Sequence, residues 1–408
     1  MEGQQYIYSK MRSGQTIVWI IGFLFSPIIA LLFALWKRNE YGAKLVIFLF
    51  SGLFGYLMNT TDYRMDLYRY LNLLQETPYN DISSVFANLY SSGSNSTSDL
   101  YVSLLQTIIG SFTNNGHILM LAFGLVFGIF YVKMIKLLPK FSDKTLLSFG
   151  IFFLFINVFG IQGLAGVRFY TAFYVFAFGA ISYINTSKKI YLLTFPAACL
   201  IHFSYIFAVL LFVLYYVLRN KPYIIYMIVG LSFVITFTSI SKLISQYGFY
   251  LGSSIEARAN AYSLENTDYV DFVNNIQSQT VWYVALRGKI AYYAAVISLM
   301  LIGIYHKRIK INRRVFQYVL LVLIFLSCRN IVIDIPDFGI RYNAIFVALF
   351  YLTLYHIFFQ NKDSMLVRII AYINVIGGVF YVLYSIRCMF YYVSIVDILL
   401  SPIVVLFE

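Results

Sequence analysis

Apolar stretches of about 20 residues follow one another along the whole chain, and this pattern constrains the fold more than any other feature. A helix needs about 20 apolar residues to cross a bilayer, and only helices and closed barrels satisfy their backbone hydrogen bonds in lipid. The sequence predicts about twelve spans, at residues 17–36, 45–60, 116–137, 145–162, 168–185, 190–202, 203–218, 222–240, 281–304, 315–333, 342–359 and 366–387. The stretch 190–218 fits either one tilted helix or two short helices broken near Pro196 and His202.

The composition excludes several classes of protein. Of the 408 residues, 61% are apolar and 12% are charged, whereas soluble domains carry about 45–50% and about 25%. A water-soluble enzyme, a disordered chain and a disulfide scaffold are therefore excluded. We predict an all-α polytopic membrane bundle with about 11–12 transmembrane helices, forming a single domain over residues 1–408.

The net charge of +13 marks the orientation of the bundle once the charges are sorted by alternate loops. Cytoplasmic loops of membrane proteins carry an excess of Lys and Arg. One set of loops holds 18 of the 30 basic residues, with only three acids (Glu40, Asp143 and Asp363). These basic residues are Lys37, Arg38, Lys44, Lys133, Lys136, Lys140, Lys144, Lys188, Lys189, Arg219, Lys221, Lys307, Arg308, Lys310, Arg313, Arg314, Lys362 and Arg368. We expect this side to be cytoplasmic, the amino terminus to lie outside, and no nucleic acid to bind.

The sequence predicts no metal, ATP or other cofactor. The three cysteines, Cys199, Cys328 and Cys388, fall in or beside apolar spans and show no metal-binding or disulfide spacing. The chain has no Walker loop, no dinucleotide glycine pattern and no HExxH motif.

Two long segments on the outer side do not look like simple connectors. They are residues 61–115 and 241–280, and long loops in compact proteins are usually functional or disordered. The first contains TDYRMDLYRYLNLL at 61–74 and a predicted interfacial helix at 99–112. Tyrosines on such loops can stack on sugar rings, and the alternative is an aromatic belt at the membrane surface.

Three charged or titratable residues are expected at the same outer edge of the bundle. Arg168 follows Gly163 and Gly166, Arg341 follows a predicted turn at Pro336 and Gly339, and His202 lies in the possible break of 190–218. An arginine near a span end can simply reach the lipid headgroups, and a lone histidine is often a packing residue. Together on one side, in glycine-broken helix ends, they favour a functional cluster. Arg287 and Lys289 lie near the outer end of another span and line the same cavity or reach the headgroups.

These residue types suit the transfer of a sugar from a lipid pyrophosphate. A guanidinium binds oxyanions through two parallel bonds and keeps its charge. A carboxylate or histidine nearby can remove the proton of a sugar hydroxyl, and positive charge stabilises the departing pyrophosphate. The leaving group is already activated, so this chemistry needs no ATP.

A series of short motifs then resembles a known family. In order, the chain carries DYRMDLYRY at 62–70, Asp99-Leu100-Tyr101, RFYTA at 168–172, Lys188-Lys189, HFSY at 202–205 and FGIRYN at 338–343. Over about residues 45–360 this is similar to the EpsG-type Wzy polymerases, which join repeat units of capsule, exopolysaccharide or O-antigen. The resemblance implies a GT-C-like glycosyltransferase that moves a growing chain from undecaprenyl pyrophosphate onto a lipid-linked unit, outside the cytoplasmic membrane.

The resemblance also suggests roles for individual residues. We assign Arg168 and Arg341 to the donor pyrophosphate, and His202 or Asp66 to the general base. Five further residues are expected to bind the substrate: Asp62, Arg69, Tyr70, Tyr101 and Arg287. Asp62 and Asp66 are four residues apart and would share a helix face, unless they belong to a solvated acidic loop. The partners expected are undecaprenyl-pyrophosphate-linked oligosaccharides, membrane lipids and a chain-length regulator.

Three other classes of protein remain open at this point. A flippase would line a central cavity and often shows internal repeats, and no convincing repeat relates the two halves of this chain. An O-antigen ligase uses similar chemistry and would differ in its product. A non-catalytic assembly or sensor protein predicts that no single outer arginine is essential.

Overall fold

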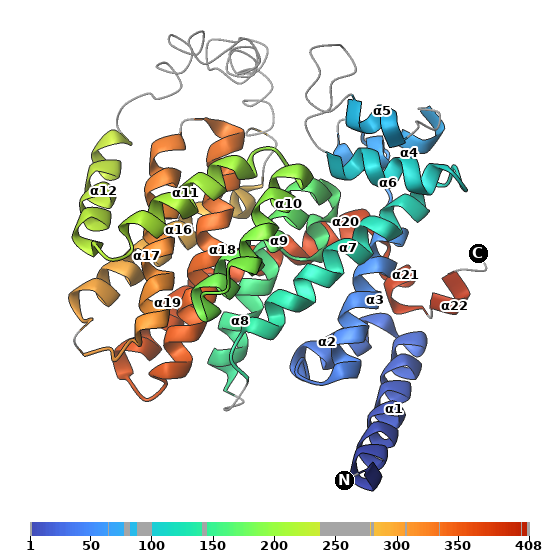
Figure 1. The fold of residues 1–408 in the computed structure, drawn as a ribbon, viewed down its shortest axis with the longest axis horizontal. Helices are drawn as coiled ribbons and strands as arrows, with labels where there is room; N and C mark the ends of the chain where they lie inside the picture. Colours follow the sequence, from blue (N-terminus) through green and yellow to red (C-terminus); the bar gives the residue numbers. More distant parts are fainter. Residues whose placement is uncertain are drawn as a thin grey trace. The chain divides into compact units, whose positions relative to one another are not determined.

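The described part of the chain consists of helices. The computed structural model describes residues 2–63, 65–76, 82–87, 100–140, 145–236, 278, 281–306, 308–333, 335–400 and 402–405. These residues form α-helices and two short 3₁₀ helices, with no strand among them (Figure 1). The predicted all-α membrane bundle is confirmed.

The helices divide into two compact units. The first unit comprises residues 1–140, 160–206 and 386–408, and the second comprises 141–159 and 207–385. Elements of the first unit are α1 Glu2–Phe25, α2 Pro27–Trp36, α3 Tyr41–Leu57, α4 Asp66–Glu76, α5 Ile82–Ala87, α6 Leu100–Gly110, α7 Gly116–Leu137, η1 Ile161–Gly166, α9 Val167–Thr186, η2 Lys189–Leu193, α10 Thr194–Ile201, α21 Ile395–Leu399 and α22 Pro402–Val405. Elements of the second unit are α8 Leu146–Val158, α12 Pro222–Ile235, α16 Trp282–Ile304, α17 Arg313–Val332, α18 Pro336–Gln360 and α19 Met365–Gly377. Two further helices, α11 Tyr205–Leu218 and α20 Val379–Tyr392, each begin in one unit and end in the other.

Six stretches of the described chain are long and apolar enough to cross a membrane. They are Gly116–Leu137, Leu146–Thr186, Trp282–Ile304, Arg313–Val332, Phe338–Gln360 and Met365–Tyr392. The other predicted spans form apolar helices of 10–17 residues, which is less than the roughly 20 residues that cross a bilayer without help. The bundle therefore combines full-length helices with shorter ones.

Local sequence signals set the first residue of many helices. Proline stands in the first turn of α2, α12 and α18, where its missing N–H costs nothing. Asn115, Thr145 and Asn312 cap α7, α8 and α17, each accepting a backbone N–H through its side-chain oxygen. These signals explain why α7 has the bounds that the sequence predicts.

The first unit is held together by close packing of α3 against α7. A Cβ at Gly55 would collide with the Met120 carbonyl oxygen, and a Cβ at Gly124 would collide with the Ser51 carbonyl oxygen. The small residues are spaced four apart in SGLFG at 51–55 and GLVFG at 124–128. This spacing brings two helix backbones into contact in membrane proteins.

The predicted span at 17–36 is wrong, because the chain reverses within it. Ser26 is extended (φ −154°, ψ 97°) and Pro27 begins α2. The Trp19 indole N–H donates to the Glu40 carboxylate over 3.2 Å, and its ring covers Gly42 at the start of α3. Those contacts require α2 to run back along α1, so residues near Gln15 lie at the same end of the hairpin as Lys37. The first apolar run is a helical hairpin, and the expectation of an outer amino terminus loses its basis.

Other boundaries also differ from the prediction. The stretch 190–218 forms two helices, α10 and α11, which break at residues 202–204. Arg341 stands in the second turn of α18 and not after a turn, because Pro336 already begins that helix. The predicted span 366–387 lies within the stretch Met365–Tyr392, in which α19 and α20 meet at Gly378, where a side chain would collide with Leu154. The predicted loop 241–280 lies outside the described residues, except for Ser278.

The α3–α7 contact can be tested by adding one methyl group. Gly124→Ala should lower the free energy of unfolding by about 1–3 kcal/mol, the usual cost of overpacking, because its Cβ meets backbone atoms of α3. Gly230→Ala on α12 is the matched control, since nothing lies within 4 Å of its Cβ. That variant should be neutral or slightly stabilising. Equal thermal unfolding of the two variants in detergent would contradict the close contact.

The hairpin predicts the accessibility of single cysteines. In a background with Cys199, Cys328 and Cys388 replaced by serine, Gln15→Cys and Asn39→Cys should react from the same side of the membrane. Asn114→Cys, at the opposite end of α7 from Lys136, should react from the other side. Labelling of positions 15 and 39 from opposite sides would restore the single span.

Candidate functional site

Seven of the nine predicted site residues belong to the first unit. They lie before and on α4, on α6, at the start of α9 and in the break after α10. They are Asp62, Asp66, Arg69, Tyr70, Tyr101, Arg168 and His202. Figure 1 shows α4, α5 and α6 gathered beyond one end of α7. Elements that are more than 100 residues apart in the chain thus supply one group of polar side chains.

Asp66 lies between two arginines. Its Oδ2 is 3.5 Å from Nη2 of Arg168, and its Oδ1 is 3.8 Å from Nη1 of Arg69. A tight charge-assisted bond measures about 2.7–2.9 Å, so these pairs are open. About a third of the Arg168 and Asp66 side chains is exposed, 32% and 37%. The three side chains carry a net charge of +1, and a ligand can reach the Arg168 guanidinium.

The start of α9 places Arg168 next to α4. The 3₁₀ helix η1 leads into α9, and the Tyr170 ring packs on Gly163, where no side chain would fit. Arg168 is therefore the second residue of α9. A cation in the first turn of a helix is unfavourable because of the helix dipole, and an anion there is favourable. Asp66, itself in the first turn of α4, offsets the unfavourable position of Arg168.

His202 lies at the break between α10 and α11 and packs against the same helix start. Its ring centroid is 5.5 Å from that of Phe169, the residue after Arg168. The hydroxyl of Tyr205 donates to the buried carbonyl oxygen of Phe169 over 3.0 Å. The break is thereby fixed to the beginning of α9. His202 lies against Phe169, the residue that follows Arg168 in the chain.

Ser204 determines which nitrogen of His202 carries the proton. The Ser204 backbone N–H donates to Nδ1 of His202 over 3.2 Å, and the Ser204 hydroxyl is 2.9 Å from the same nitrogen. A backbone amide can only donate, so Nδ1 is an acceptor. The proton of the neutral ring is then on Nε2, which acts as a donor in this conformation.

The two predicted tyrosines, Tyr70 and Tyr101, pack against α7 beside the site. Tyr70 is 5% exposed, and its ring centroid is 5.6 Å from that of Phe123. The Tyr101 ring is tilted against the same Phe123 ring, with the centroids 5.2 Å apart, and burial raises the pKa of its hydroxyl well above the usual value. In this conformation both rings pack α4 and α6 onto α7, and their contact with a sugar stays a prediction.

Arg287 and Arg341 belong to the second unit. Arg341 is exposed on α18. The Arg287 guanidinium lies over the Tyr384 ring, 3.2 Å from its centroid, and its Nη1 is buried with no hydrogen-bond partner in the described part of the chain. Their predicted roles toward the substrate stay predictions.

A polar network in the second unit was missed by the sequence reasoning. Arg329 lies over the ring of Tyr292, 3.5 Å from the centroid. Its Nε donates to Oδ1 of Asn343 and its Nη1 to Oδ1 of Asn330, both over 3.3 Å. The hydroxyl of Tyr292 donates to the same Asn330 oxygen over 2.8 Å. The available signal was an Arg-Asn pair inside an apolar run, with a second asparagine in FGIRYN.

Comparison with known proteins assigns the chain to a family. The model of the EpsG family matches residues 43–394. The chain belongs to the EpsG family. It is therefore a multi-pass membrane protein of polysaccharide synthesis. No curated protein and no solved structure matches the chain. The geometry of the two units of this EpsG-family protein, and of the polar groups in each, is therefore taken from its own structure.

The bond between Tyr205 and Phe169 should be measurable as stability. Tyr205→Phe removes one donor to a buried carbonyl and should lower the free energy of unfolding by about 1 kcal/mol. Tyr63→Phe is the control, because Tyr63 is 72% exposed. The measurement is thermal unfolding of both variants in the same detergent. Identical midpoints would show that this bond does not hold the break in place.

Proposed function

We propose that the chain is a polysaccharide polymerase. It transfers a growing glycan from undecaprenyl pyrophosphate onto the nonreducing-end sugar of a lipid-linked repeat unit, at the outer face of the cytoplasmic membrane. The observation that carries the proposal is the accessible Arg168 guanidinium, held by Asp66 at the start of α9 beside His202, in a chain of the EpsG family.

In the proposed reaction, one sugar hydroxyl replaces a pyrophosphate. The hydroxyl oxygen attacks the anomeric carbon of the donor glycan and forms the new glycosidic bond. The bond between that carbon and the phosphate oxygen breaks, and undecaprenyl pyrophosphate leaves with the electron pair. The proton of the hydroxyl passes to a base in the site. The Arg168 guanidinium stabilises the negative charge on the leaving oxygens.

The hydrogen bonds around His202 favour Asp66 over His202 as that base. Nδ1 of His202 accepts from the Ser204 amide, so Nε2 of the neutral ring carries the proton and cannot accept one from a sugar hydroxyl. The Asp66 side chain is 37% exposed, so a sugar hydroxyl can reach its carboxylate, which the two arginines do not hold tightly. The roles predicted for Arg341 and Arg287, which belong to the second unit, stay predictions.

The proposal is tested by the glycans of cells that carry Arg168→Ala in place of the native chain. Long polysaccharide should be lost, and single repeat units should remain displayed outside, because the leaving pyrophosphate is no longer stabilised. Arg168→Lys keeps the charge without the planar fork and should restore only part of the chain length. The matched control is Arg368→Ala, an exposed arginine in the first turn of α19, which should leave the ladder unchanged.

The location and form of the glycans separate the other functions. Repeat units that stay inside the cell would indicate a flippase. Long chains that are formed but not attached to their lipid core would indicate a ligase. Normal long chains in Arg168→Ala cells, with the variant present in the membrane at wild-type level, would remove Arg168 from the mechanism.

A further inference from the structure

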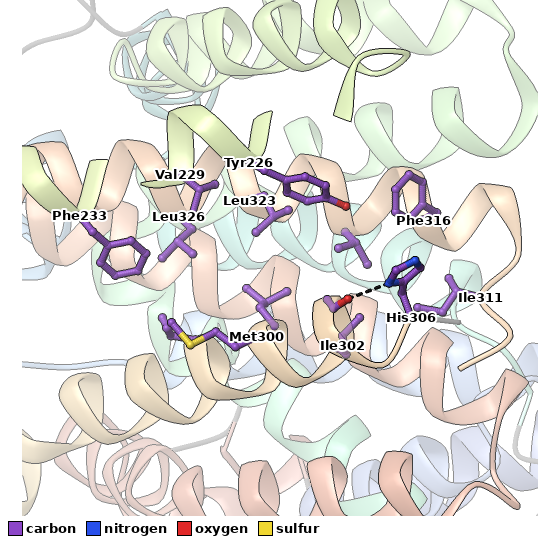
Figure 2. Close-up of a pocket in the computed structure, with 14 residues that line it drawn as sticks. Tyr226, Val229, Phe233, Met300, Ile302, His306, Ile311, Phe316, Leu323 and Leu326 are labelled. Atoms are coloured by element: carbon purple, nitrogen blue, oxygen red, sulfur yellow. Dashed lines mark hydrogen bonds between the residues drawn. The ribbon is translucent and has the colours of Figure 1, made fainter. Parts of the chain in front are cut away.

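An apolar groove runs between three helices of the second unit. Figure 2 shows side chains of α12, α16 and α17 around a cavity of about 180 Å³. One end is lined by Phe233, Val229 and Leu326, and the other by His306 and Phe316. The groove is open on one side, where Met300 is 55% exposed and Tyr226 is 49% exposed. Its lining is almost entirely aliphatic or aromatic, which suits a hydrocarbon chain.

The Arg329 network lies one helical turn beyond the Phe233 end of this groove on α16 and α17, and it meets α12 at Ser232. On α17, Arg329 is three residues after Leu326, and on α16, Tyr292 is four residues before Val296, which also lines the groove. Residues three or four apart share a helix face. On α12, Ser232 precedes Phe233 and accepts a hydrogen bond from Nδ2 of Asn330 over 3.1 Å. The groove therefore has a cationic, hydrogen-bonding end.

Arg329 is held in place by neutral groups only. No carboxylate within the described ranges pairs with it, and its partners are two asparagine oxygens and an aromatic face. A guanidinium has five N–H donors, and Nε and Nη1 each use one, so three donors have no partner among the described residues. Charged side chains at such depth in a membrane protein are costly and usually mark a ligand site. The asparagines fix the planar fork, and its remaining N–H donors lie at its edge, where an oxyanion can accept from them.

From this juxtaposition we propose that the second unit binds a polyprenyl pyrophosphate lipid, with its pyrophosphate on Arg329 and its chain in the groove. The choice of this lipid rests on the proposed function, because a polymerase handles such molecules. The groove is a single track between α12, α16 and α17, so it takes one segment of a single apolar chain. A two-chain phospholipid would leave one chain outside the groove. The site is separate from the Asp66–Arg168 group, which belongs to the other unit.

The headgroup contact is tested with purified full-length protein in detergent and undecaprenyl pyrophosphate as the probe. Arg329→Gln removes the charge, and the loss of charge-assisted bonds should weaken binding about tenfold or more. The Tyr292–Asn330 bond does not involve Arg329, so the fold should persist with an unchanged elution profile. Arg329→Lys keeps the charge and should bind with intermediate affinity.

The chain contact is tested by filling the groove from a position that has space. Gly303 lines the groove, and nothing lies within 4 Å of a Cβ built there. Gly303→Phe should therefore fold normally and weaken binding of the polyprenyl lipid about tenfold. Binding of inorganic pyrophosphate, which has no chain, should not change. The matched control is Gly230→Phe, another open glycine, on α12 but outside the groove lining.

Each outcome decides for or against the site. Weaker lipid binding in both Arg329→Gln and Gly303→Phe, with a normal Gly230→Phe, supports it. Unchanged binding in either variant overturns it, and equal affinity of the wild type for phosphatidylglycerol overturns the choice of lipid. The readout is binding, so it is independent of the polymerase proposal. Loss of polymer in Arg168→Ala with unchanged binding in Arg329→Gln would leave the proposed function and remove only this inference.

Discussion

The structure depends on a rule that lipid imposes on the backbone. A peptide group in hydrocarbon must find its hydrogen bond within the chain, so helices run until a residue stops them. Polar residues stand at or near several of the breaks. Arg168 follows the 3₁₀ segment η1, His202 lies in the break between α10 and α11, and Arg341 comes shortly after the start of α18. A break is where a polar substrate can meet polar protein groups without opening a helix.

The two units solve the problem of a membrane arginine in different ways. Arg168 has a carboxylate partner, Asp66, at an open distance, so its charge is balanced and still reachable. Arg329 has no such partner in the part of the chain that the structure describes, and it is fixed by amides and a tyrosine ring. A balanced pair suits a site that must bind and release a reacting group. An unbalanced cation at the end of an apolar groove suits an anionic lipid that brings the missing charge.

The sequence was sufficient wherever the signal is local. Asn115 caps α7, and its span 116–137 was predicted with the observed bounds. The break at His202 was one of two open alternatives, and a run of 29 residues without a charge could not decide between them. The hairpin at Ser26 was missed because hydropathy does not register the direction of the chain, and Pro27 also fits an unbroken span. The pairing of Asp66 with Arg168 joins residues 102 apart, so no local pattern contains it.

Helix lengths also indicate how deep each arginine lies within its own unit. From Thr186 back to Arg168, α9 rises about 27 Å, and from Lys189 to His202 the shorter helices η2 and α10 rise about 22 Å. Both ends meet at Phe169, so the site of the first unit lies nearly one hydrocarbon thickness of about 30 Å from the basic turn Lys188–Lys189. In the second unit, α17 rises about 24 Å from Arg313 to Arg329. In each unit the arginine thus lies at the opposite end of its own helix from a basic pair, Lys188–Lys189 in the first unit and Arg313–Arg314 in the second.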